Sequence, residues 1–289
     1  MPPPASPPTT CYRHPDRPTG VRCARCDRPI CPECMTPAAV GFQCPDDVRA
    51  GNAGVRRPRR ASGWSAARRR FGPVTATLVA VNVVVFVITA VSAVSEGASP
   101  LDNYESEVFR DFSLVPVLVD VYGQDWRLIT GAFLHIGITH LLLNMLSLLL
   151  FGPEIEARLG WWRYLAVYLV SALGGAVAIQ LFGDPGRPVA GASAAIYGLL
   201  GAMGVLLVAA RQDLRGLLAL LAINVVISFL PGVSLLGHLG GLAAGLLATT
   251  LLVLARRRVA VQAAGLALLA VAMVVLVLVV PVPVVVLGL

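Results

Sequence analysis

The sequence predicts an all-helical membrane protein with seven transmembrane helices, preceded by a small cysteine-rich module. Of its 289 residues, 56% are hydrophobic and 13% are charged, whereas soluble domains contain about 45–50% apolar and about 25% charged residues. All six cysteines lie between Cys11 and Cys44, and the chain after Phe71 is almost entirely apolar. We therefore expect a metal-binding module at residues 1–50, an arginine-rich linker at 51–70 and a membrane domain at 71–289.

The seven transmembrane helices are predicted from runs of apolar residues. A helix that crosses a membrane needs about 20 mostly apolar residues. Seven segments reach or approach that length, at residues 73–94, 132–151, 162–181, 192–210, 214–230, 235–254 and 261–280. Pro281 and Pro283 stop the last of them.

The distribution of arginines predicts how these helices are oriented in the cell membrane. Eight arginines and no acid lie between Val48 and Ser95, and further arginines follow the second, fourth and sixth segments. The loop at residues 96–125 instead carries seven acids and one arginine. Basic loops stay in the cytoplasm, so the N-terminus is predicted to be cytoplasmic and the C-terminus to lie outside. The arginine run could also contact nucleic acid, but its place beside an apolar segment favours membrane orientation, and we expect no nucleic-acid partner.

Polar side chains within the apolar segments are candidates for function, because they are costly in a membrane unless paired. No Asp or Glu lies inside any segment, which weakens the interpretation as a transporter or proton pump. What remains is His135, His140 and Asn144 on the second segment, Ser193 on the fourth and His238 on the sixth.

These residues converge at one depth in the predicted topology. The second, fourth and sixth segments all run inward, and each carries its polar residues near its start, so an active site would open toward the outer side. Ser193 and His238 could form a nucleophile–base pair, a dyad because no acid is in reach. The Ser193 N–H, Asn144 and His140 would donate to the oxyanion. Taken alone, a serine in such a helix more often bonds its own backbone.

Four motifs resemble those of the rhomboid intramembrane serine proteases. GASAAIYG at 191–198 resembles the family's nucleophile motif, HIGITHLLLN at 135–144 its second-helix pattern, and GHLGGLAAG at 237–245 its sixth-helix motif. Trp126 and Arg127 match a WR pair in the first loop. The resemblance covers about residues 71–280 in the same order and spacing. It implies a six-helix rhomboid core with one further helix at the C-terminus.

The resemblance also implies roles for individual residues. Ser193 would be the nucleophile and His238 the base, with Tyr197 stacked on the base. Asn144 and His140 would line the oxyanion hole together with the Ser193 N–H. Further roles are structural: Gly241 and Gly245 would let the sixth helix pack against the fourth, Trp126 and Arg127 would support the loop, and His135 would bond a loop or water partner.

The N-terminal module carries four pairs of potential metal ligands. Each pair has two residues between its members, a spacing that suits tetrahedral zinc. The pairs are Cys11/His14, Cys23/Cys26, Cys31/Cys34 and Cys44/Asp47, with Asp46 as the alternative eighth ligand. They resemble a B-box-type zinc finger, in which pairs one and three, and pairs two and four, would each hold an ion. Disulfides are the alternative, although the reducing cytoplasm disfavours them.

The function predicted is hydrolysis of peptide bonds in or near transmembrane segments of client proteins. The alternative is a non-catalytic rhomboid-like scaffold that binds single-span clients, in which the Ser193/His238 pair would be lacking. Two structural zinc ions are expected, and none for catalysis. The expected partners are transmembrane substrates, the lipid bilayer and a protein that docks on the zinc module.

Overall fold

The computed structural model describes residues 9–53, 70–229 and 232–282. The chain divides into two compact units, Met1–Ala61 and Ser62–Leu289, which are treated separately below. The predicted linker at 51–70 falls largely outside the described residues.

The N-terminal unit is built from short elements around its cysteines. These elements are β1 (Thr10–Cys11), β2 (His14–Pro18), η1 (Pro32–Cys34), β3 (Thr36–Pro37), β4 (Phe42–Gln43) and α1 (Pro45–Asn52). Strands β1 and β2 form one antiparallel pair and β3 and β4 another. The buried core of the N-terminal unit consists of five cysteines and Ile30, with Cys26 packed against them. So small an apolar core supplies little folding energy by burial alone.

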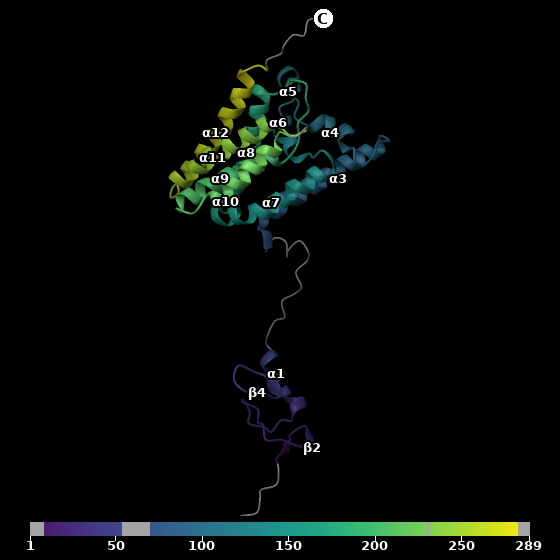
Figure 1. Ribbon diagram of the computed structural model, residues 1–289, viewed down its shortest axis with the longest axis vertical. Helices are drawn as coiled ribbons and strands as arrows, with labels where there is room; N and C mark the ends of the chain where they lie inside the picture. The colour runs from purple at the N-terminus through teal and green to yellow at the C-terminus, as the bar shows by residue number, and fades with distance from the viewer. Residues whose placement is uncertain (1–8, 54–69, 230–231, 283–289) are drawn as a thin grey trace, which may run out of the picture. The chain divides into compact units, whose positions relative to one another are not determined.

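The second unit is a helical bundle, coloured from blue through teal and green to yellow in Figure 1. Five of its helices are long and apolar enough to cross a membrane: α3 (Pro73–Ser95), α7 (Gly137–Leu159), α8 (Trp161–Phe182), α11 (Leu235–Leu254) and α12 (Val259–Val279). Two further apolar helices are shorter, α9 (Ser193–Ala209) and α10 (Arg215–Ile227). The seven predicted segments therefore all contain a helix, but only five have full spanning length within the described residues.

The boundaries of the second predicted segment were wrong at both ends. Residues 131–133 form the short 3-10 helix η3 (Gly131–Phe133), and α7 begins only at Gly137, whose φ of 70° is left-handed. Such a φ suits glycine and interrupts regular helix. The helix then continues through Pro153 to Leu159. His135 consequently precedes the helix on which it was predicted to lie.

Helix α11 is the centre of the bundle and packs against both α8 and α9. Glycines make this approach possible, as predicted. A Cβ added to Gly241 or Gly245 would overlap the backbone carbonyl of Ala194 or Gly198 on α9. Backbone-to-backbone contact of this kind is typical of small residues at membrane helix interfaces.

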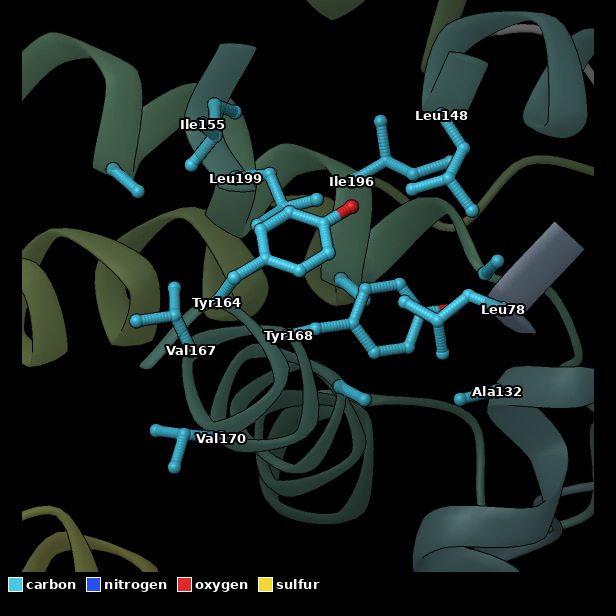
Figure 2. Packing of buried hydrophobic residues seen from close by; sticks show 14 of the residues in the cluster. Leu78, Ala132, Leu148, Ile155, Tyr164, Val167, Tyr168, Val170, Ile196 and Leu199 are labelled. Carbon is cyan, nitrogen blue, oxygen red and sulfur yellow. The ribbon is translucent and has the colours of Figure 1, made fainter. Parts of the chain in front are cut away.

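A second contact region joins α3, α7 and α8 around two buried tyrosines. Figure 2 shows Tyr164 and Tyr168 of α8 among Leu78, Leu148 and Ile155, and both rings are fully buried.

A buried carboxylate of α7 fixes the start of α3 in the same region. The side chain of Glu156 accepts hydrogen bonds from the backbone N–H groups of Val74 and Thr75, at 2.9 and 2.8 Å. These amides have no acceptor inside their own helix, and a carboxylate is favoured at a helix N-terminus.

The long segment between α3 and α7 folds against the bundle. It contains η2 (Asn103–Glu105), α4 (Glu107–Phe112), α5 (Pro116–Tyr122) and α6 (Arg127–Thr130). The guanidinium of Arg127 is buried and donates hydrogen bonds to the carbonyls of Arg110 and Ser113, both at 2.7 Å. Leu114 forms a β-bridge with Val189, which ties this segment to the residues that precede Ser193.

Candidate active site and metal centre

Ser193 is the first residue of α9, and the backbone before it is held open by a glycine. Gly191 has a φ of 138°, which side-chain-bearing residues rarely adopt, and its N–H donates to the Gly131 carbonyl at 2.9 Å. As a residue of the first turn, Ser193 has a backbone N–H with no acceptor inside its helix. The hydroxyl and this N–H are therefore presented together at a helix N-terminus.

His238 lies at the start of α11, which the side chain of Ser234 caps by accepting from the Gly237 N–H at 3.1 Å. The Nε2 atom of His238 is 2.9 Å from the Oγ atom of Ser193. His238 as a whole residue is 5% exposed. The structure thus brings the two residues of the predicted dyad into hydrogen-bond contact across two helices.

Tyr197 packs against the face of the His238 imidazole. It lies one turn after Ser193 on α9, so the two side chains share a helix face. Its ring stacks on that of His238 with centroids 4.0 Å apart and 14° between the planes. A stacked, buried ring leaves the imidazole little freedom to rotate.

His140 is placed to donate to an atom bound beside Ser193. Its Nδ1 accepts from the Ile136 N–H at 3.3 Å, so the proton of the neutral ring is on Nε2. A Cβ added to Gly191 would lie 2.8 Å from this Nε2 and 3.7 Å from Ser193 Oγ. Glycine therefore keeps open a space that both groups border.

Asn144 lies one turn further along α7. Its Nδ2 donates one hydrogen to the His140 carbonyl at 2.9 Å, which leaves the second amide hydrogen for a ligand. Asn144, His140, Ser193 and His238 all line one cavity of about 540 Å³. The cavity also reaches Asn224 on α10.

One residue of this cluster was missed by sequence analysis. Ser228, which follows α10, is 3% exposed, and its Oγ lies 2.6 Å from His238 Nδ1 and 2.9 Å from the Tyr197 hydroxyl. A signal was available. The predicted fifth segment runs outward, so its C-terminal end reaches the depth at which the second, fourth and sixth begin.

His135 does not join the cluster. Its ring is fully buried and packs edge-on against that of His140 with centroids 5.1 Å apart, but it does not line the cavity. Neither ring nitrogen has a hydrogen-bond partner among the described residues. Its backbone carbonyl accepts from Asn103 Nδ2 at 2.7 Å, so this stretch is fixed through the main chain.

The eight predicted metal ligands come together in the N-terminal unit as two groups of four. One group is Cys11, His14, Cys31 and Cys34, and the other is Cys23, Cys26, Cys44 and Asp47. Within each group the ligand atoms lie within 4.8 Å of one another. This grouping has the cross-brace pattern that the resemblance implied.

The distances within the groups fit zinc. Tetrahedral sites with Zn–S bonds of about 2.3 Å have ligand–ligand edges of about 3.8 Å. The Sγ atoms of Cys26 and Cys44 are 3.7 Å apart, and His14 Nδ1 is 3.3 Å from the Cys31 Sγ. All six thiols are free, which disfavours the disulfide alternative.

Asp47, rather than Asp46, belongs to the second group. Hydrogen bonds from the thiols of Cys26, Cys23 and Cys44 lower the pKa of the Asp47 carboxyl to about 2, so its carboxylate is directed at the three cysteines of this group. Asp46 instead accepts from the Tyr12 hydroxyl at 2.9 Å and pairs with Arg28 and Arg49.

Comparison with known proteins agrees with the rhomboid-like motifs of the membrane unit. Residues 122–255 match the family model described as the Rhomboid domain. The chain is 40% identical over 130 residues to "RHOMBOID-like protein 6, mitochondrial" and 39% identical over 157 residues to "RHOMBOID-like protein 1", both of Arabidopsis thaliana. These matches cover 43% and 52% of this chain, but only 42% and 40% of the two plant proteins.

A bacterial relative is covered more fully. "Putative rhomboid protease YdcA" of Bacillus subtilis is 38% identical over 143 residues, which is 47% of this chain and 71% of that protein. With its apolar helices, this chain is a multi-pass membrane protein and belongs to the rhomboid family.

Proposed function

We propose that this protein is an intramembrane serine endopeptidase that hydrolyses peptide bonds in or near transmembrane segments of client proteins. The observation that carries the proposal is the 2.9 Å contact between Ser193 Oγ and His238 Nε2 at one end of an apolar helical bundle. The protease name of the bacterial relative supports it. A scaffold without catalysis would have no need of this pair, so the geometry favours the enzyme.

The proposed chemistry follows from the contacts. His238 Nε2 takes the hydroxyl proton as Ser193 Oγ attacks the scissile carbonyl carbon. Negative charge develops on the carbonyl oxygen, where the Ser193 N–H, His140 Nε2 and Asn144 Nδ2 would donate. The imidazolium then protonates the leaving amine, and water hydrolyses the acyl-enzyme by the same route in reverse.

The direct test is cleavage of a single-span reporter by the full chain in proteoliposomes. Wild type is expected to release a defined fragment, and Ser193→Ala to release none, because the nucleophile is lost without a change in packing. Ser95→Ala is the matched control. Ser95 is exposed and bonds only the Ser92 carbonyl of its own helix, so this variant should cleave normally. Cleavage by Ser193→Ala at the wild-type rate would reject the proposal.

We predict that Asn144→Ala lowers turnover by about 10²–10³, the usual effect of removing one oxyanion donor. Some activity should remain because the Ser193 N–H and His140 still donate. Steady-state kinetics on the same reporter measures this. Unchanged kinetics would remove Asn144 from the oxyanion hole.

We propose that the active site opens on the outer side of the cell membrane, with the N-terminus in the cytoplasm. Asp184 and Asp213, which lie in the loops on either side of α9, are both exposed. In intact cells an impermeant thiol reagent should label Asp184→Cys and not Asp213→Cys. The opposite pattern would invert the topology.

We propose further that the N-terminal unit binds two structural zinc ions, which tie its short strands together and contribute folding energy. The purified chain should contain about two zinc ions, measured by elemental analysis. The paired substitution Cys31→Ser/Cys34→Ser should remove one ion, because the other group keeps its ligands. Metal-free protein purified under reducing conditions, or loss of both ions in this variant, would contradict two independent sites.

A further inference from the structure

The hydroxyl of Ser228 is a fourth member of the hydrogen-bonded cluster around His238. It contacts His238 Nδ1 at 2.6 Å, the Tyr197 hydroxyl at 2.9 Å and the Asn224 carbonyl at 2.8 Å. The side chain is buried, so these three groups are its partners rather than water. Ser228 comes from the end of α10, whereas the residues of the dyad come from α9 and α11.

Only one arrangement of protons makes all three contacts of the Ser228 hydroxyl hydrogen bonds at the same time. A serine hydroxyl has one proton and two lone pairs. The Asn224 carbonyl can only accept, so the serine proton goes to it. The two remaining contacts must then be accepted by Ser228 Oγ, one from the Tyr197 hydroxyl and one from an N–H on His238 Nδ1.

This arrangement decides the chemistry of the other imidazole nitrogen. A neutral imidazole with its proton on Nδ1 has a bare Nε2, and this is the atom that faces the Ser193 hydroxyl at 2.9 Å. The opposite tautomer would direct an N–H at Ser193 and could not take its proton. The choice of tautomer therefore separates a competent base from an incompetent one.

We propose that Ser228 is a positioning residue that holds His238 in the Nδ1–H tautomer and ring orientation required of the base. It does so with a neutral acceptor, in a site where the described residues provide no carboxylate. Because the bond is made to a hydroxyl that Asn224 and Tyr197 orient, the acceptor is fixed before substrate binds. The catalytic consequence of this proposal rests on the proposed function. The tautomer of His238 does not, because it can be measured without any activity.

The kinetic test uses the full chain and the single-span reporter. Ser228→Ala is expected to lower kcat about tenfold, which corresponds to about 1.4 kcal/mol, and to leave KM unchanged. Ser228→Thr keeps the hydroxyl and should recover most of kcat. Thr77→Ala is the control for loss of a helical back-bond. Thr77 is exposed and bonds only the Pro73 carbonyl, so this variant should keep wild-type kcat. Wild-type kcat in Ser228→Ala, with thermal unfolding also unchanged, would overturn the proposal.

A spectroscopic test needs neither substrate nor activity. The 15N spectrum of the histidine-labelled chain, assigned by difference against His238→Gln, shows which ring nitrogen carries the proton. Wild type should have the proton on Nδ1, and Ser228→Ala should show a mixture of tautomers. A wild-type proton on Nε2 would overturn the proposal. A wild-type chain that has the expected tautomer but does not cut the reporter would instead contradict the proposed function.

Discussion

His238→Ala is expected to lower reporter cleavage by about 10³-fold or more. The serine hydroxyl is a weak nucleophile unless a base takes its proton during attack, and general base catalysis contributes about 10²–10⁴. Here the effect should lie at the upper end, because the described cavity offers no carboxylate that could replace the imidazole. Cleavage rates in proteoliposomes measure it.

Two further variants separate the loss of the base from a disturbed structure. His238→Gln keeps a planar polar group over Tyr197 but cannot act as a base, so it should be as inactive as His238→Ala. Tyr197→Phe keeps the ring that stacks on the imidazole at 4.0 Å and should retain most activity. Thermal unfolding of all three should stay near wild type. An active His238→Gln enzyme would show that another group takes the proton.

Gly245→Ala is expected to destabilise the bundle by about 3 kcal/mol, the upper range for overpacking. The new Cβ would overlap the Gly198 carbonyl oxygen and lie 2.5 Å from its carbonyl carbon. Backbone atoms in the middle of a helix cannot rotate away as a side chain can. Helix α11 must therefore move from α9, and the contact between His238 and Ser193 should be lost with it. Thermal unfolding and cleavage should fall together.

Gly204→Ala on α9 is the matched control. Its Cβ would meet only the end of the Leu217 side chain at 3.4 Å, which is ordinary contact. Alanine is also the better helix former by roughly 0.5–1 kcal/mol. This variant should be as stable as wild type or slightly more so. Equal stability of Gly245→Ala and Gly204→Ala would mean that α9 and α11 do not touch through their backbones.

The sequence was sufficient to predict the helical membrane class, because apolar runs of about 20 residues in a chain with few charges are typical of helices that cross a membrane. It also indicated that Ser193, His238, His140 and Asn144 meet, since alternating helix direction places the starts of three segments at one depth. The family resemblance added Tyr197, and the stacking on His238 has the geometry that the resemblance implied.

What sequence could not supply was local geometry. Residues 132–136, which are apolar except for His135, were predicted to be helical, yet Gly137 has a left-handed φ that breaks regular helix there and leaves His135 outside α7. Ser228 was not predicted, because one serine among apolar residues carries no periodic signal and only the depth of its segment end points to it. Its role depends on three contacts made to two other helices and one carbonyl, and these exist only after the bundle has formed.

Covalent labelling of the serine tests the central claim most directly. A fluorophosphonate reacts with a serine that a neighbouring base activates, so treatment of the full chain followed by peptide mass spectrometry locates the nucleophile. We expect one adduct, on Ser193, in wild type, and none in His238→Ala. An adduct on another serine, or equal labelling of Ser193 without His238, would contradict the Ser193–His238 dyad.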